Sequence, residues 1–262
     1  MSELRPGLPR WLLLPAAVAV LFLAVPLLAL VVRQPWAEIP GLLGSAAARD
    51  ALWLSLRTCT LSMLLSVALG LPLALVLSRL TGHWAALVRT LSMLPMVLPP
   101  VVAGFLLLIT LGRRGLLGTQ LSHWGVEIGF TTAAVVIAQT FVSMPFFVVA
   151  VEGALRTLDP AYEAVAATLG ASPWVVLRRV TLPTVAPAVL SGATMAFARS
   201  LGEFGATLTF AGSMQGTTRT MPLEIYLQRE SDPDLALALS LVLIVLAAVL
   251  IVLPALLLRR RA

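Results

Sequence analysis

The chain has 262 residues, of which 59% are hydrophobic and only 11% are charged. Soluble domains carry roughly 25% charged residues, and a fold of this size cannot hide so much apolar surface in one core. The composition therefore excludes a soluble enzyme, a disordered chain and a disulfide scaffold, and it indicates an integral membrane protein.

The formal net charge of +6 comes from arginine alone, because all 18 basic residues are Arg and the chain has no Lys. In so apolar a chain this charge is not a nucleic-acid signal, and we expect no nucleic-acid partner. Without Lys the chain lacks the P-loop lysine that binds phosphates, so any energy from ATP must come from a partner protein. The only cysteine, Cys59, cannot form an internal disulfide and is interpreted as a small buried residue.

Six stretches without charged residues are each long enough for a membrane helix, which needs about 20 residues. The first is about twice as long as the apolar core of a signal peptide, so we interpret it as a retained helix. The sequence thus predicts an all-α, multi-pass membrane protein with six transmembrane helices: Trp11–Val32, Thr58–Ser78, Thr90–Gly112, Ile128–Val151, Val180–Ala198 and Leu235–Leu258.

An even number of spans places both termini on one side of the membrane. With the N-terminus inside, ten Arg lie on the inner side and eight on or near the outer side, and eight of the 12 acidic residues lie outside. This bias is modest, and Arg113-Arg114 in an outer loop opposes it. The acid-free loop from Arg79 to Arg89 and the Arg259-Arg260-Arg261 tail favour the N-in, C-in topology.

Three prolines interrupt the third predicted span, at Pro95, Pro99 and Pro100. Proline breaks regular helix hydrogen bonding, and hydrocarbon tolerates the freed backbone groups only against protein or a water-filled cavity. The pattern predicts that this span faces the interior of the helix bundle. A simple kink is the alternative.

Two connections are long, residues 152–182 on the cytoplasmic side and residues 199–234 on the outer side. Neither carries the composition of a domain boundary, so residues 1–262 are predicted to form a single transmembrane domain. In the cytoplasmic segment, Asp159-Pro160 is typical of a helix start, and Gly170 suits the left-handed residue that follows a helix end at Leu169.

A second start signal follows at Ser172-Pro173 and predicts a short helix to about Val180, after which Pro183 opens the fifth span. The first short helix carries a surface of small residues that would fit the groove of another protein. This pair of helices is therefore either an ordinary interfacial loop or a knob that receives mechanical work from a soluble partner.

The outer end of the fifth span carries Arg199 and Glu203, which lie about 24 and 30 Å along a helix that starts near Pro183. Residues four apart can pair on one helix face, and charged residues in a span usually face the interior and mark a pathway. The alternative is that both side chains reach the outer headgroups.

The cytoplasmic segment resembles the EAA loop of ABC importer permeases, whose pattern is E-A-A, three residues, Gly, nine residues and Ile-x-Leu-Pro. Gly170 and Leu182-Pro183 are in register with that pattern, and Val180 stands at the Ile position. Glu163 lies one residue earlier than the usual Glu, whose place is taken by Ala164. In the family this loop is the coupling helix that sits in a cleft of the ATPase subunit.

The run from Phe197 to Thr207 and the proline-rich third span resemble the molybdate, sulfate and thiosulfate branch of these permeases. The stretches Phe210–Tyr226 and Asp234–Ser240 are most similar to the molybdate members. The resemblance covers most of residues 50–258, and the first 50 residues match nothing we can name.

The resemblance implies a type I ABC importer permease that translocates molybdate across the cytoplasmic membrane of a prokaryote, with transport of tungstate left open. It implies a homodimer, two ABC ATPase subunits that bind the ATP, and an extracytoplasmic oxyanion-binding protein; this chain itself would carry no cofactor, metal or catalytic residue. Site residues are carried over in two sets. Those expected to couple to the ATPase are Glu163, Ala164, Ala167, Gly170 and Pro183, and those expected at the pore or gate are Pro95, Pro99, Pro100, Arg199, Gly202, Glu203, Gly205 and Thr207.

Other functions stay open at this point. A sulfate or thiosulfate permease differs only in substrate. A secondary transporter or channel would need no ATPase and no cytoplasmic helix pair. A membrane enzyme is the weakest alternative, because no catalytic groups cluster, and His83 and His123 each lack neighbours at metal-ligand spacing.

Overall fold

The computed structural model describes residues 9–259, with side chains except those of Arg10, Ile251 and residues 253–259. Glu3, Arg5, Arg260 and Arg261, which entered the predicted topology, lie outside the described residues. The described part is helical and contains no strand. Its elements are η1 (Arg10–Leu12), α1 (Leu13–Val32), α2 (Ile39–Leu43), α3 (Ala46–Arg79), α4 (Gly82–Val97), α5 (Pro100–Leu111), α6 (Gly118–His123), α7 (Thr132–Thr157), α8 (Pro160–Thr168), α9 (Pro173–Val176), η2 (Leu177–Thr181), α10 (Leu182–Leu201), α11 (Gly205–Ala211), α12 (Met221–Ser231) and α13 (Pro233–Arg259).

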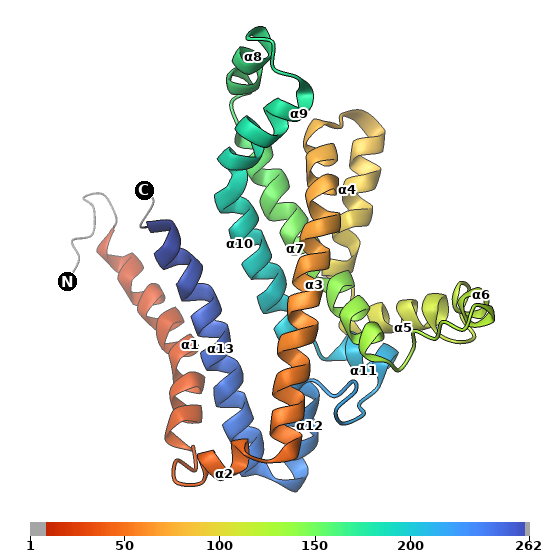
Figure 1. Ribbon diagram of the computed structural model, residues 1–262. Helices are drawn as coiled ribbons and strands as arrows, with labels where there is room; N and C mark the ends of the chain where they lie inside the picture. The colour runs from red at the N-terminus through yellow and green to blue at the C-terminus, as the bar shows by residue number, and fades with distance from the viewer. Residues whose placement is uncertain (1–8, 260–262) are drawn as a thin grey trace.

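Five helical stretches are long and apolar enough to cross a membrane, and α4 with α5 makes a sixth if a bent pair counts as one span. All six predicted spans therefore have a counterpart, which confirms the all-α membrane fold. Figure 1 shows α8 and α9 at the end of the molecule toward which the terminal ends of α1 and α13 also point, with α2 and α12 at the opposite end. The side of the membrane on which each end lies stays a prediction.

The third predicted span is not one helix. The chain bends by 115° between α4 and α5, around Leu98 and Pro99, and α5 leaves the bundle sideways with α6 near its far end (Figure 1). Leu98 and Pro99 both have extended backbone, with ψ of 138° and 134°. The cause is local, because a proline disfavours helical backbone in the residue before it, and both residues precede a proline.

The predicted break before Pro183 is also wrong, because helix continues from Pro173 to Leu201. The join is the π-helical turn η2, which follows α9 and leads directly into α10. A proline ring clashes with the carbonyl one turn before it. A widened π turn relieves that crowding without ending the helix.

The main core lies where α3, α7 and α10 pack together. Phe147 of α7 is fully buried and sits between two glycines of the neighbouring helices. A Cβ built on Gly70 would lie 2.7 Å from the Phe147 ring, and one on Gly192 would lie 3.2 Å from it. Small residues let membrane helices approach closely, and here they make room for one large aromatic ring.

A second core joins α5, α7 and α11 around Phe210. α1 has no buried residue and contacts α13 at the edge of the molecule. α4 is tied to α7 by an ion pair in which Arg89 Nη2 lies 2.7 Å from Oε1 of the buried Glu152.

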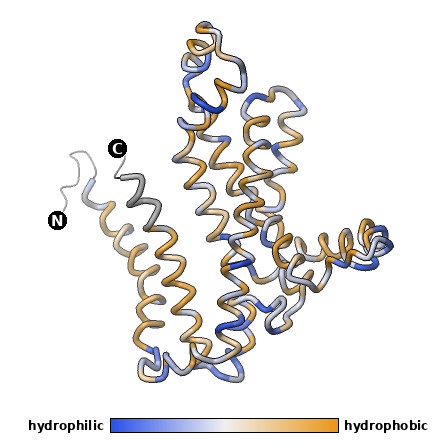
Figure 2. The backbone as a smooth tube through the Cα atoms, viewed as in Figure 1, coloured by the Kyte–Doolittle hydropathy of each residue, from blue (hydrophilic) through white to orange (hydrophobic). Residues whose placement is uncertain are grey.

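Residues 199–234, predicted as a long outer connection, contain the two helices α11 and α12. Figure 2 shows hydrophobic residues along the long helices and hydrophilic residues gathered near the molecule's two ends and around α6. The distribution is that expected of a bundle whose middle lies in hydrocarbon.

Candidate functional site

The predicted first cytoplasmic helix is confirmed as α8. Its start is capped by Asp159, whose Oδ1 accepts a hydrogen bond of 2.9 Å from the backbone N–H of Ala161. It ends at Thr168, one residue earlier than predicted, and Gly170 has the left-handed φ of +84° expected after a helix end.

The outward face of α8 is more apolar than the small-residue surface that was predicted. Tyr162, Val165 and Leu169 are 60%, 59% and 82% exposed, and they recur at intervals of three and four residues, so they share one face. Trp174 on α9 is 65% exposed. We call these four residues the apolar knob. Ala164 and Ala167 are also exposed on α8, and Tyr162, Leu169 and Trp174 were not among the residues predicted for this surface.

Glu163 points the other way, into its own chain. Its two carboxylate oxygens lie 3.0 and 3.2 Å from Nη2 of Arg79, the last residue of α3. Oε1 also accepts a hydrogen bond of 2.6 Å from the hydroxyl of Thr181 in the turn η2. The carboxylate therefore connects α8 with both α3 and the start of α10. Pro183 lies exposed two residues beyond Thr181.

The proline-rich break packs against residues 202–206, the GEFGA run, at the crossing of α5 with α11. A Cβ on Gly205 would lie 2.9 Å from Cβ of Pro100, and a Cβ on Gly104 would lie 2.6 Å from the carbonyl oxygen of Ala206. Pro95 lies inside α4, and Pro99 is exposed at the break. The structure thus brings Pro100 and Gly205 together.

Gly202 does not take part in this close packing within the described chain, because nothing lies within 4 Å of its Cβ position. It follows the last residue of α10 and is exposed. Both glycines were expected at the gate, and of the two only Gly205 has neighbouring atoms within 4 Å of its Cβ position. Thr207, two residues further on, is fully buried in α11.

Arg199 and Glu203 form the predicted pair, with Nη1 2.6 Å from Oε2. Glu203 is not on the same helix, however, because α10 ends at Leu201. Its other oxygen accepts a hydrogen bond of 2.8 Å from the backbone N–H of Ala206 at the start of α11. The N-terminus of a helix leaves its first N–H groups without partners and favours a negative charge. This explains why the buried carboxylate of Glu203 lies between α10 and α11, at the start of α11.

Five hydroxyl side chains meet in the interior of the bundle and were missed by the sequence analysis. Ser62 Oγ lies 3.0 Å from Oγ of Ser200 and 3.3 Å from Oγ of Ser143, and it accepts from Thr140; Ser66 lies 3.3 Å from Ser143. We call this set the hydroxyl cluster. It joins α3, α7 and α10. Spacings of three and four within α3 and α7 were the only signal for it.

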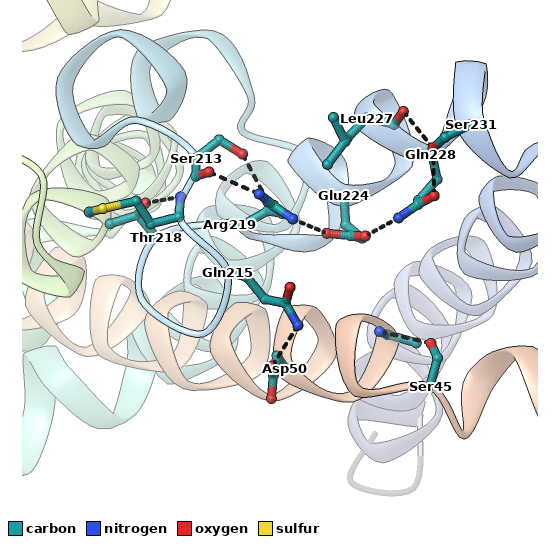
Figure 3. A network of polar contacts seen from close by, with 12 residues as sticks. Ser45, Asp50, Ser213, Gln215, Thr218, Arg219, Glu224, Leu227, Gln228 and Ser231 are labelled. Carbon is teal, nitrogen blue, oxygen red and sulfur yellow. Dashed lines mark hydrogen bonds and ion pairs between the residues drawn. The ribbon is translucent and has the colours of Figure 1, made fainter.

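The outer segment is held by a polar network (Figure 3). Arg219 donates to the hydroxyl and the carbonyl of Ser213, and its Nη1 lies 3.4 Å from the buried Glu224. Gln228 donates to the same carboxylate at 2.7 Å. Arg219 is therefore neutralised by Glu224 in the same way as Arg199 is by Glu203.

Comparison with known proteins identifies the family of the chain. Residues 66–262 match the model described as the binding-protein-dependent transport system inner membrane component. The chain is 55% identical over 244 residues to the molybdenum transport system permease protein ModB of Mycobacterium tuberculosis (strain ATCC 25618 / H37Rv), covering 93% of this chain and 92% of the relative. It is 43% identical over 178 residues to ModB of Escherichia coli (strain K12), covering 68% and 78%.

A solved structure with the same fold is a bacterial ABC transporter involved in the import of the acidic polysaccharide alginate. The TM-score is 0.75 with 22% sequence identity, covering 95% of this chain and 94% of that chain. At this identity the likeness concerns the fold alone. The family model, in contrast, matches more than half of the sequence, so the chain belongs to the inner membrane components of binding-protein-dependent transport systems.

Proposed function

We propose that this chain is the permease subunit of an ATP-driven importer that carries molybdate, and tungstate as a close analogue, across the cytoplasmic membrane. The observation that carries the proposal is the identity of 55% over 244 residues to a relative named as a molybdenum permease. The apolar knob supports it, because large apolar side chains exposed on one face of a helix outside the long spans are typical of an interaction site.

Family membership makes the chain a multi-pass inner membrane protein with no catalytic role, and the ATPase of such systems is a separate subunit. We propose the finer arrangement of two copies of this chain around a central pathway, two ATPase subunits and one extracytoplasmic oxyanion-binding protein. The knob would dock in a cleft of each ATPase subunit. Its helices α8 and α9 lie at the end of the molecule opposite α12 (Figure 1).

In the proposed cycle, ATP binding closes the ATPase pair and moves both knobs, which switches the pathway from inward-facing to outward-facing, and hydrolysis resets it. Residues around the α4–α5 break and the α10–α11 gap are the proposed gate, namely Pro95, Pro99, Pro100, Arg199, Gly202, Glu203, Gly205 and Thr207. The support is that helix breaks at membrane depth occur where backbone lines a cavity or packs on protein.

The charges of the outer half favour a weak rather than a tight anion site. Arg199 and Arg219 each face a buried carboxylate, so neither offers an uncompensated positive charge to a dianion. Transport requires sites that release the ion, and tight binding of the anion would slow its passage. We therefore assign the selectivity mainly to the binding protein.

The test is ATP-dependent uptake of labelled molybdate and labelled sulfate into vesicles that contain the chain, its ATPase and its binding protein. Molybdate uptake that excess sulfate fails to block supports the proposal. Sulfate uptake would agree with the permease function and would refute molybdate as the substrate. If neither anion moves although the complex assembles and hydrolyses ATP, the oxyanion assignment is wrong.

A further inference from the structure

The carboxylate of Glu163 is the point at which three elements meet. It accepts from Arg79 Nη2 at 3.0 Å and from the Thr181 hydroxyl at 2.6 Å. Arg79 ends α3, Glu163 lies in the first turn of α8, and Thr181 ends the turn η2. Both carboxylate oxygens are thus engaged within the chain, and the carboxylate does not lie on the face of the apolar knob.

Apart from this contact, α8 is held within the described chain only by its two connections and by its packing on α9 and η2. The nine-residue helix is preceded by the extended residues Leu158 and Asp159 and followed by Gly170 with its positive φ. A short helix on such connections can rotate relative to the bundle. A movement of the ATPase would then turn α8 alone and would not move the long helices.

The two other partners belong to the main helices of the bundle. Thr181 is 1% exposed, and the helix that it precedes runs on to Arg199 at the proposed gate. α3 is a continuous helix of 34 residues, and at its outer part Ser55 accepts a hydrogen bond from the backbone N–H of Met221 in α12. Both helices also pack against α7. π-helical turns such as η2 are frequent at functional sites.

We propose that Arg79, Glu163 and Thr181 form a strut that makes α8 move as one body with α3 and α10. Arg79 and Thr181 are positioning residues: they hold Glu163, and the apolar knob contacts the ATPase. The inference rests on the proposed function, because it concerns how the motion of the ATPase reaches the pathway. In this proposal Glu163 faces the rest of its own chain and transmits the motion, whereas the residues of the apolar knob bind the ATPase.

The first test measures molybdate uptake and ATP hydrolysis in the complete complex in vesicles. Arg79→Glu and Glu163→Arg are each expected to lower uptake per ATP hydrolysed by about fivefold, the lower end of the range for coupled sites. The double variant Arg79→Glu/Glu163→Arg restores the opposite charges and is expected to recover most of the ratio. Co-purification of the ATPase should stay at the wild-type level in all three variants.

The control is a second ion pair between separate segments of the described chain, Arg113 with Glu127, whose closest atoms are 3.2 Å apart. Arg113→Glu breaks this pair, which is more exposed than Arg79 with Glu163, at a site away from α8, and it should leave uptake per ATP unchanged. Thr181→Val removes the hydroxyl at constant shape and should lower the ratio, whereas Thr181→Ser keeps the hydroxyl and should preserve it.

A second test asks whether the strut stays closed during transport. In the double variant Arg79→Cys/Glu163→Cys, a short thiol-specific cross-linker joins α3 to α8, and the native Cys59 is buried and out of its reach. Uptake should be higher with the cross-link than without it. Loss of uptake on cross-linking would show that the two helices must separate, and it would overturn the strut.

The strut is also overturned if the single variants keep the wild-type ratio, or if the charge swap fails to rescue them, since each residue would then act through another contact. Failure of the wild-type complex to move molybdate would refute the proposed function instead. In that case the strut is judged by the stimulation of ATP hydrolysis by the binding protein, which should be lost in the single variants and recovered in the swap.

Discussion

Gly104 allows the closest approach between the proline-broken helix and the GEFGA run, so Gly104→Ala tests the arrangement of the proposed gate. A Cβ at this position would lie 2.6 Å from the carbonyl oxygen of Ala206, 2.8 Å from its Cα and 2.8 Å from Cβ of Thr209. Ordinary contacts of a Cβ begin at 3.4 Å, so α5 and α11 must separate by about 0.8 Å. Two of the three opposing atoms are backbone and cannot rotate away.

Overpacking of this kind costs about 1–3 kcal/mol, and we expect the upper half of that range. The assay is the free energy of unfolding of the purified complex in detergent, followed with the uptake rate in vesicles. Gly153→Ala is the matched control, because Gly153 is also inside a helix but has nothing within 4 Å of its Cβ position. That substitution should stabilise the helix by about 0.5–1 kcal/mol. If Gly104→Ala is as stable as the control and transports at the wild-type rate, the described contact of α5 with α11 is wrong.

Three further changes probe the coupling helix and the gate. Gly170→Val places a β-branched residue at φ +84°, which costs at least about 1–2 kcal/mol locally, and should lower uptake per ATP hydrolysed while membrane insertion is retained; unchanged coupling would count against docking through α8. Leu169→Asp puts a charge on the apolar knob and should reduce co-purification of the ATPase at least tenfold, a result that Thr168→Asp beside it should not reproduce. Glu203→Ala leaves Arg199 without its partner and removes the cap of α11, so the complex should lose about 3–5 kcal/mol of stability; a loss below 1 kcal/mol would show that the carboxylate is not buried as described.

Features that depend on neighbouring residues in the chain were predictable from the sequence. The start of α8 follows from Asp159-Pro160, because both capping and the fixed φ of proline act within one turn. The break near Pro99 was predictable for the same reason. Its angle was not, because the direction that α5 takes depends on its packing against α11.

Features that depend on distant partners were missed. α12 has 11 residues and no long apolar run, and the N–H of its first residue bonds to Ser55, 166 positions away. The pairing of Arg199 with Glu203 was predicted from a spacing of four, but the end of α10 between them was not. Glu163 was recognised as a coupling residue from its motif, whereas Arg79 lies 84 positions away and carries no motif of its own.

The hydroxyl cluster bears on how the bundle can move at all. Each Ser or Thr hydroxyl can either donate or accept, and for the pairs that involve Ser62 with Ser143 or Ser200 the geometry admits both directions. A small rotation of α10 against α3 and α7 would exchange hydroxyl partners within the cluster, while Ser200 keeps its hydrogen bond to the carbonyl of Ala196 in its own helix. A cluster of apolar side chains of the same size would lock into a single interdigitated arrangement, and an ion pair would resist separation in hydrocarbon. In the importer proposed above, such a cluster would let α10 turn slightly against α3 and α7 while its hydroxyls keep hydrogen-bond partners.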